Sequence, residues 1–263
     1  MSVLTPMSHA LAAIVAAAHA GLTSLGADPA SGVTWLLCIA AVVAIVRLAL
    51  LPLAVHGVRL AHASARARPQ LRELTERHRS QPIGLRELAE ERRRISAENH
   101  LPRGGALPLL VQVPIWLALY HLMTAVAAGT AVGALGSGLV ASLGAATLLG
   151  VPLAERGYLG GGLTHLAVVA GLAASAATLS YVTQRYLVAP AAVLDSVPDA
   201  VSRVQQMVPM ISAVGLVVAG GVVPVALLVY WVCNGVWSLA QSAVIWRWFP
   251  TPGSPAATRA GSS

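Results

Sequence analysis

Long apolar runs dominate this sequence, and each is about as long as a helix that crosses a bilayer. Five such runs lie at about 34–56, 107–128, 163–186, 206–222 and 224–246. Only 10% of the 263 residues are charged, whereas a soluble domain usually carries about 25%. We therefore expect an all-α, polytopic membrane protein with five transmembrane helices, and not a large soluble core.

The charged residues are concentrated between the first two runs. The stretch 58–106 holds eleven arginines and six glutamates, and loops rich in basic residues stay on the cytoplasmic side of a membrane. With five spans, Arg185 and Arg203, at and after the end of the third run, and Arg247 and Arg259, after the fifth, also lie inside. A sixth apolar stretch, 131–154, would place these four arginines outside if it crossed the membrane. We therefore expect an external loop or an interfacial segment there.

The charged stretch itself predicts two helices, at 60–79 and 84–99, joined by a turn at Pro82. Each helix has a thin apolar stripe, which suits an antiparallel helical hairpin that projects from the membrane. One interpretation is a docking surface for ribosomes, nascent chains or anionic lipid headgroups. The other is a solvated loop that only fixes topology. Specific nucleic-acid binding is not indicated, because no aromatic residues are interleaved with the arginines.

The N-terminal residues show apolar side chains at helical spacing from Leu4 to Leu25, and Thr5–Pro6 makes a reasonable helix start. We expect an amphipathic helix on the outer surface, with a cleaved signal peptide as the alternative. The expected organisation is an external amphipathic N-terminal helix (1–30), a first span (31–57), a cytoplasmic charged helical hairpin (58–106), four further spans (107–248) with an external loop (129–162) and a cytoplasmic loop (187–205), and a cytoplasmic tail (249–263).

One arginine, Arg47, lies inside the first apolar run, where a charge costs about 2.5–3.5 kcal/mol on insertion scales. The five runs contain no Asp or Glu, so only amides, hydroxyls, backbone carbonyls or water can accept its hydrogen bonds. An intramembrane charge of this kind faces a bundle interior or a water-filled cavity. We therefore expect a hydrated groove with an unneutralised positive charge, which suits negative or polar substrate groups.

Polar residues in the other runs are candidates for the same groove. Four of them share one helical face in the fifth run, because they are spaced four, four and three residues apart. Each alone could make an ordinary interhelical hydrogen bond. As a set, they can supply the hydrogen-bond acceptors that Arg47 requires. The candidate groove residues are Arg47, Gln112, Tyr181, Gln184, Tyr230, Trp231, Asn234, Ser238 and Gln241.

Catalytic and metal-binding patterns are absent from the sequence. It has no G-x-S-x-G, no H-E-x-x-H and no paired Asp in the runs. Cys38 and Cys233 lie in apolar runs without a C-x-x-C pattern, as is typical of inert buried cysteines. We expect no enzyme activity, no metal and no cofactor.

Four motifs in order resemble the YidC–Oxa–Alb family of membrane protein insertases, and the likeness runs from about Trp35 to Trp248. They are IVRLALLPL at 45–53, LPRGGALPLLVQVPIWLALYHLM at 101–123, QQMVPM at 205–210 and VPVALLVYWVCNGVWSLAQS at 223–242. The resemblance implies five core helices around a groove open to the cytoplasm and to lipid. It also implies that Arg47 lies at the centre of the groove, with Gln184 and Trp231 on its wall.

The function that the resemblance implies is that of an insertase and chaperone in the bacterial cell membrane, with its N-terminus outside and its C-terminus in the cytoplasm. The implied partners are nascent membrane proteins and the lipid bilayer, with the ribosome and the Sec translocon as further candidates. Two competing interpretations are a small-anion transporter and a non-catalytic membrane assembly scaffold. A transporter would require an internal repeat, which the sequence does not show.

Overall fold

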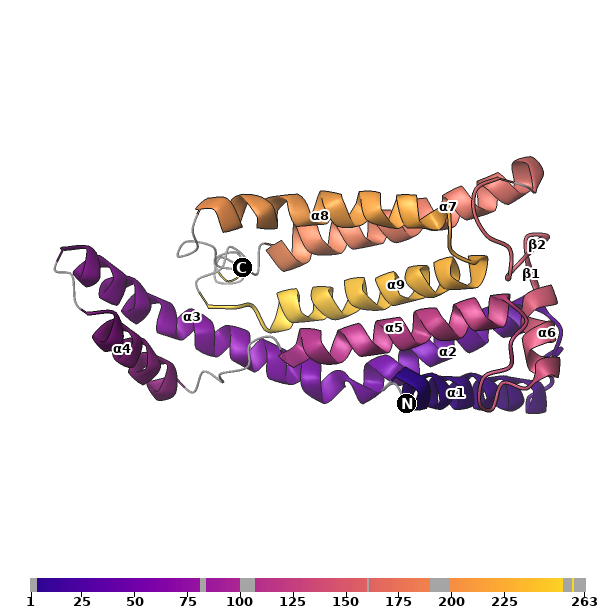
Figure 1. Ribbon diagram of the computed structural model, residues 1–263, viewed down its shortest axis with the longest axis horizontal. Coiled ribbons are helices and arrows are strands. Elements are labelled where there is room, and N and C mark those ends of the chain that lie inside the picture. Colours follow the sequence, from indigo (N-terminus) through magenta and orange to yellow (C-terminus); the bar gives the residue numbers. More distant parts are fainter. Residues whose placement is uncertain are drawn as a thin grey trace.

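A computed structural model describes residues 4–80, 84–99, 107–159, 161–189, 199–252 and 257. The chain forms an elongated bundle of helices, with a helical hairpin at one end and a short helix with a small sheet at the other (Figure 1). The elements are α1 (Leu4–Ser24), α2 (Gly32–Ala49), α3 (Leu51–Ser80), α4 (Leu85–Glu98), α5 (Leu107–Ala127), α6 (Ser137–Ala145), β1 (Thr147–Leu148), β2 (Val151–Pro152), α7 (Gly162–Val182), the π-helix η1 (Thr183–Val188), α8 (Asp199–Gly220) and α9 (Val225–Trp248).

Four helical stretches in the described part of the chain are long and apolar enough to cross a membrane: Thr5–Ser24, Gly32–Ala49, Gly162–Val188 and Val225–Trp248. Shorter apolar stretches lie in α5 (Leu117–Ala127) and α8 (Gln206–Gly220). The prediction of an all-α polytopic membrane protein is confirmed. The number of spans and their orientation stay predictions.

The core lies around α9, which packs against α2, α5 and α7. At the start of α9, Leu227 and Leu228 are fully buried, and Leu119 and Leu122 of α5 are buried in the same cluster. Toward its C-terminal half, α9 becomes more exposed and carries polar side chains. The tight packing at one end therefore anchors a helix whose other half is free to line a cavity.

The N-terminal helix α1 runs antiparallel to α2 and packs lengthwise on α2 and α5 (Figure 1). Leu11, Ala12 and Val15 are buried on one face, and His19 stacks on Trp35 at a centroid distance of 4.5 Å. The sequence predicts a helix on the outer surface, and the structure has the helix as one wall of the bundle. Its position relative to a membrane stays a prediction.

The first apolar run does not form one uninterrupted helix. Helix α2 ends at Ala49, where Leu50 has φ −87° and ψ 0°, and α3 begins at Leu51 and continues to Ser80. Pro52 lies in the first turn of α3, where its missing N–H costs nothing. The break comes three residues after Arg47 and so places that side chain in the last turn of α2.

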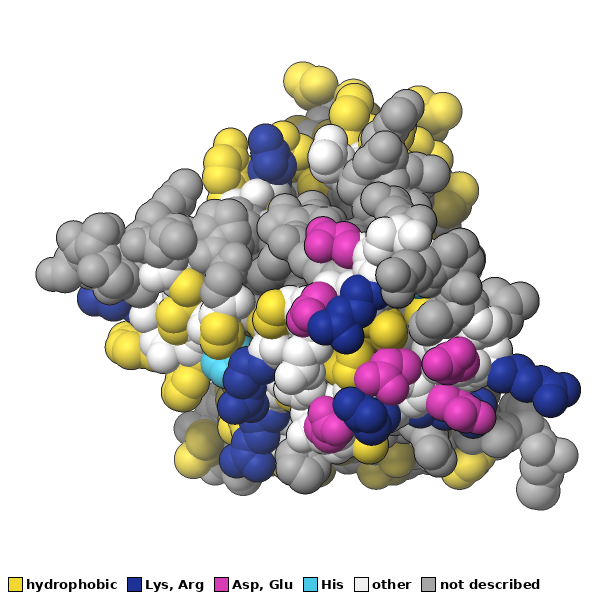
Figure 2. Space-filling model, turned by 90° about the vertical axis from the view of Figure 1, so that its left-hand side faces the viewer, with side chains coloured by type: hydrophobic (Ala, Val, Ile, Leu, Met, Phe, Trp, Pro, Cys, Tyr) yellow, Lys and Arg dark blue, Asp and Glu magenta, His cyan; other side chains and the backbone are white. Residues whose placement is uncertain are grey.

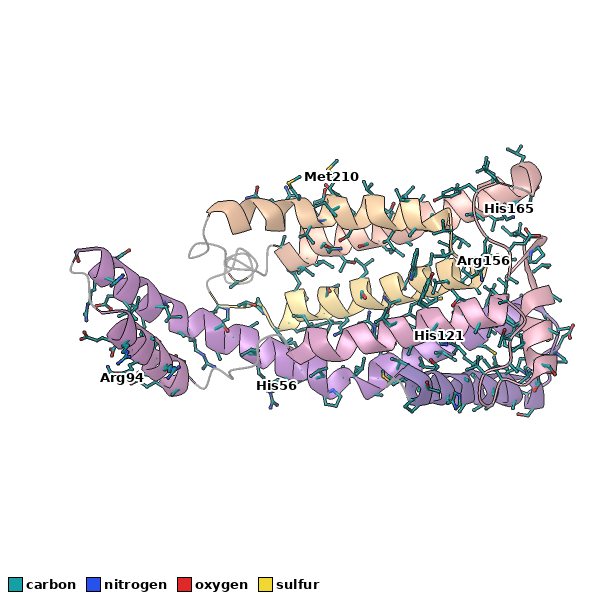
Figure 3. The ribbon with its side chains drawn as sticks, viewed as in Figure 1. His56, Arg94, His121, Arg156, His165 and Met210 are labelled. Atoms are coloured by element: carbon teal, nitrogen blue, oxygen red, sulfur yellow. The ribbon has the colours of Figure 1, made fainter. Side chains whose placement is uncertain are left out.

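At the α6 end, the segment 131–158 covers the helix ends and forms no helix of membrane length, since α6 has nine residues. Leu153 and Glu155 accept the first backbone N–H groups of α9 at 2.9 Å. The guanidinium of Arg156 donates to the carbonyl of Thr124 near the end of α5 at 3.2 Å. His165, labelled with Arg156 in Figure 3, is buried near the start of α7 beside the Gly157 carbonyl at 2.8 Å. These bonds tie α5, α7 and α9 together at one end.

At the opposite end, α3 and α4 form an antiparallel hairpin where the sequence predicts two helices. Among the described side chains, its shared core is Ala67, Leu74 and Ile95, with Leu71 and Leu88 partly buried against them. Exposed ion pairs such as Glu73–Arg77 cover the outside, and Figure 2 shows acidic and basic side chains gathered on this end. So small a core gives the hairpin little stability of its own. Its place outside the apolar bundle agrees with its charge.

Candidate functional site

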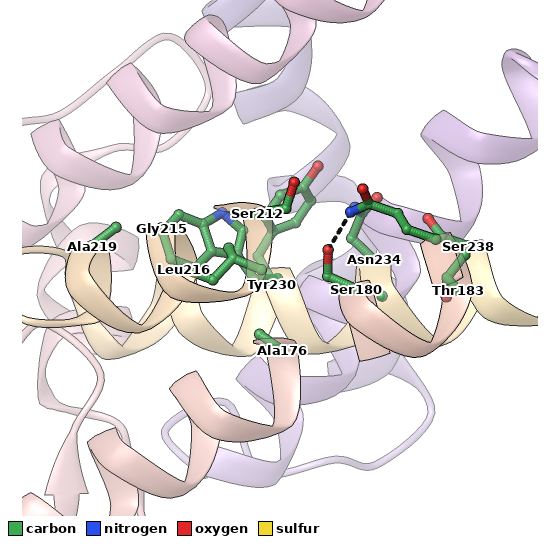
Figure 4. Close-up of a pocket in the computed structure, with 13 residues that line it drawn as sticks. Ala176, Ser180, Thr183, Ser212, Gly215, Leu216, Ala219, Tyr230, Asn234 and Ser238 are labelled. Atoms are coloured by element: carbon green, nitrogen blue, oxygen red, sulfur yellow. Dashed lines mark hydrogen bonds between the residues drawn. The ribbon is translucent and has the colours of Figure 1, made fainter. Parts of the chain in front are cut away.

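A cavity of about 550 Å³ lies between α7, α8 and α9 (Figure 4). Helix α7 packs on both α8 and α9, so the cavity separates the other two helices. It is lined by Ala176, Ser180, Thr183, Gln184, Ser212, Gly215, Leu216, Ala219, Tyr230, Trp231, Asn234, Gly235 and Ser238. A cavity of this size between predominantly apolar helices offers an environment different from lipid.

The lining is polar toward the α4 end of the bundle and apolar toward the α6 end. Small or apolar side chains such as Ala219 and Ala176 lie toward the α6 end, whereas Asn234, Thr183 and Ser238 lie toward the other (Figure 4). The polar groups are amides and hydroxyls, and none of the described lining residues is charged. The cavity therefore offers neutral hydrogen-bonding groups at one end and packing surface at the other.

The aromatic wall comes from the first third of α9. Tyr230 is 8% exposed and Trp231 is 9% exposed. Because they are consecutive, they point in different directions around the helix, and both still reach the cavity. They mark the transition between the packed half of α9 and its polar half.

The π-helix η1 shapes the polar end of the cavity. Helix α7 ends at Val182, and the backbone N–H of Ala189 then bonds to the carbonyl of Gln184, five residues earlier. π-helical turns are rare and occur frequently at functional sites. Thr183, at the start of this turn, lines the cavity with only 6% exposure. Gln184 donates from Nε2 to Oγ of Ser180 at 2.8 Å.

Arg47 reaches the same site from α2. Its Nε and Nη2 atoms donate to Oδ1 of Asn234 at 3.0 and 2.7 Å, and Nη2 also donates to Oγ of Ser238 at 2.8 Å. These are the amide and hydroxyl partners that a charge without a carboxylate requires. Among the described residues, Arg47 makes no ion pair.

Arg47 also borders a much smaller void. A void of about 10 Å³ lies beside Arg47, lined by Arg47, Asn234 and Tyr230 and by apolar residues of α1, α2 and α5. Arg47 is not among the described residues that line the large cavity, whereas Asn234 belongs to both linings. Asn234 therefore stands between the guanidinium and the cavity.

The structure brings most of the candidate groove residues together. Gln184, Tyr230, Trp231, Asn234 and Ser238 line the cavity, and Arg47 is bonded to two of them. Their functional roles stay predictions.

Three candidates are placed differently or lie outside the description. Tyr181 is 36% exposed and Gln241 accepts a hydrogen bond from Trp237 at 3.2 Å, and neither is among the described residues of the cavity wall. The backbone of Gln112 lies in α5, but its side chain falls outside the described part of the chain.

Sequence reasoning missed the contribution of α8. Ser212, Gly215 and Ala219 face the cavity, and their spacing of three and four residues places them on one helical face. A stripe of small residues inside an apolar run was the available signal. Met210 lies on the outside of the same helix and points away from the bundle (Figure 3).

Comparison with known proteins shows similarity over most of the chain. A family model described as 60Kd inner membrane protein matches residues 27–252. The protein named Membrane protein insertase YidC from Streptomyces avermitilis is 30% identical over 241 residues, which cover 88% of this chain and 55% of that protein. Proteins with the same name from Bifidobacterium longum and Tropheryma whipplei (strain Twist) are 23% and 25% identical over 97% and 96% of this chain, and over 78% and 86% of their own length. The chain thus spans about half the length of the Streptomyces relative.

Proposed function

The chain belongs to the 60Kd inner membrane protein family, and from this premise we propose that it is a membrane protein insertase. It moves hydrophilic segments of nascent membrane proteins through an intramembrane groove and releases their spans into lipid. The observation that carries this proposal is the 550 Å³ cavity, whose polar end lies beside the guanidinium of Arg47. The relatives whose printed name is Membrane protein insertase support it.

The physical task of an insertase is to lower the cost of taking polar groups across hydrocarbon. Each unsatisfied backbone polar group costs several kcal/mol in lipid. A segment inside the cavity can instead bond to amides and hydroxyls on α7, α8 and α9. The charge of Arg47 favours polar and negative groups there, and the membrane potential, worth about 2.3 kcal/mol per charge per 100 mV, draws negative groups outward.

The proposed orientation has the polar end of the cavity open to the cytoplasm. The arginine-rich hairpin α3–α4 lies at that end of the bundle, and basic loops remain in the cytoplasm. With five spans, the N-terminus is outside and the C-terminus is in the cytoplasm. The segment 131–158, which ties the helix ends together, is then external.

The proposed partners follow from this arrangement. Nascent membrane proteins and lipid contact the helix bundle. The charged surface of the α3–α4 hairpin is available to bind ribosomes or the Sec translocon. The proposed reaction makes and breaks no covalent bond, so no catalytic residue, metal or cofactor is part of it.

Reconstitution tests the proposal directly. Purified protein in liposomes should insert a single-span client whose external segment then becomes protected from added protease. Protein-free liposomes and liposomes that contain an unrelated membrane protein give the background. Client protection no greater than this background would refute the insertase function.

A further inference from the structure

The hydrogen-bond directions around Arg47 fix how Asn234 is oriented. Arg47 has only donors, and two of its nitrogens bond to Oδ1 of Asn234 at 3.0 and 2.7 Å. The amide oxygen is therefore held against the guanidinium, and Nδ2, with its two hydrogens, is directed away from it. Asn234 also lines the cavity, so it is its donor end that is available there.

The same logic applies to two hydroxyl groups. Oγ of Ser238 accepts from Arg47 at 2.8 Å, and Oγ of Ser180 accepts from Gln184 at 2.8 Å. Each oxygen is occupied as an acceptor by a side chain of the protein, so each hydroxyl hydrogen remains available to donate. Both serines line the cavity, so with Nδ2 of Asn234 they place three donors at its polar end, beside the Oε1 acceptor of Gln184.

A further hydroxyl at this end has no partner. Oγ1 of Thr183 is buried and makes no hydrogen bond with any described residue, although Thr183 lines the cavity. A buried polar atom without a partner costs about 1–3 kcal/mol. Oγ1 itself has almost no exposed surface, so a group that enters the cavity can bond to it only after the Thr183 side chain turns toward the cavity.

We infer that Arg47 is a positioning residue, which acts through Asn234 and Ser238 to make the cavity a binding site for the main-chain carbonyl oxygens of an extended client segment. This inference rests on the proposed insertase function and names what the site recognises. Arg47 polarises its two partners, and they, with Ser180 and Thr183, contact the client.

The spacing of the donors fits an extended main chain. Asn234 and Ser238 are four residues apart on α9, which separates them by about 6 Å along the helix. Carbonyl groups on one side of an extended strand recur every two residues, or about 6.6 Å. Main-chain carbonyls are present in every client, so such a site tolerates any sequence. None of the described wall residues is acidic and would repel the carbonyl oxygens.

A double-mutant cycle between Arg47 and Asn234 tests whether Arg47 acts on the client through Asn234. The measured quantity is the insertion rate of a client with a neutral external segment in proteoliposomes. Arg47→Ala and Asn234→Leu should each lower the rate by about two- to tenfold, the range expected for losing hydrogen bonds of ordinary strength. The double variant should be no slower than the slower single variant, because both changes remove the same donor.

Two further variants make the test specific. Thr183→Val keeps the shape of the side chain and removes only the hydroxyl, so it should lower the insertion rate without lowering the melting temperature. In a double variant with Arg47→Ala, the two reductions in insertion rate should multiply, because Thr183 contacts the client independently of Arg47. Ser175→Ala is the matched control, since Ser175 is exposed on α7 and bonds to its own helix at the Gly171 carbonyl.

Each outcome decides a different question. If the double variant slowed insertion by the product of the two single effects, Arg47 would contact the client itself. That result would overturn the inference that Arg47 acts through Asn234. A neutral client that is unaffected by Arg47→Ala, while an acidic one slows, would overturn it too. Unchanged insertion by Thr183→Val would remove that hydroxyl from the carbonyl site. Failure of the unchanged protein to insert any client would instead refute the proposed function.

Discussion

Replacing Arg47 with alanine should leave the protein folded while insertion falls. The guanidinium joins α2 to α9 through three N–H···O contacts, two to Asn234 and one to Ser238. A residue that holds two helices together would ordinarily be expected to be structural. The free energy of these hydrogen bonds, compared with the cost of the charge in the membrane, indicates that Arg47 is not needed for stability.

The two opposing contributions nearly cancel. Interhelical hydrogen bonds in membrane proteins average about 0.6 kcal/mol each, so three contribute about 1.8 kcal/mol. A charge at the middle of a span costs about 2.5–3.5 kcal/mol on insertion scales, and removing Arg47, in the last turn of α2, relieves at most that amount. The variant should therefore be as stable as the unchanged protein, or more stable by about 1 kcal/mol. Asn234 and Ser238 line the cavity, where water can replace the lost donor.

Thermal unfolding in detergent, measured beside insertion in proteoliposomes, checks this balance. We expect an unchanged or slightly higher melting temperature together with a clearly lower insertion rate. A melting temperature that drops by ten degrees or more, with insertion reduced only in proportion to the folded fraction, would show that Arg47 is structural and that the reasoning is wrong.

Three further predictions concern topology, the hairpin and the α6 end. In a background without native cysteines, a cysteine at Gly138 should react with an impermeant reagent added outside, and one at Glu87 only after the membrane is opened; the reverse pattern contradicts the orientation. Deleting 71–95 should slow client insertion while the melting temperature of the bundle is kept, and insertion at the full rate would limit the hairpin to fixing topology. Gly32→Ala should lower the free energy of unfolding by about 1–3 kcal/mol, because its Cβ would lie 1.9 Å from the carbonyl oxygen of Thr147; Gly138→Ala, with open space around it, should not.

The sequence was sufficient to predict the helices and the need for partners around Arg47. Apolar runs of membrane length have few alternatives to helix, and an arginine without nearby carboxylates must find amides or hydroxyls. The spacing of residues along α9 also placed Asn234 and Ser238 on one face, and the structure has both bonded to Arg47.

What the sequence could not predict depends on backbone detail and on helix packing. The turn at Thr183–Val188 is π-helical, whereas periodicity assumes a regular α-helix through that segment. The cavity wall on α8 consists of Leu216 and of three small residues, Ser212, Gly215 and Ala219. Their common face can be seen in the sequence, but the surface that this face meets is known only once the neighbouring helix is placed. Helix α1 has only a slight difference in polarity between its two faces. Residue types alone therefore do not decide whether its apolar side packs on lipid or on α2 and α5.

Photo-crosslinking from matched positions tests the central claim most directly. Each of three helices offers one position on the cavity wall and one exposed position nearby: Ser180 and Ser175 on α7, Ser212 and Met210 on α8, and Ser238 and Val236 on α9. With a photoreactive residue at each, a client arrested during insertion should crosslink through its hydrophilic segment to the cavity position of every pair and much less to its neighbour. Equal crosslinking within all three pairs would show that the client does not pass through this cavity.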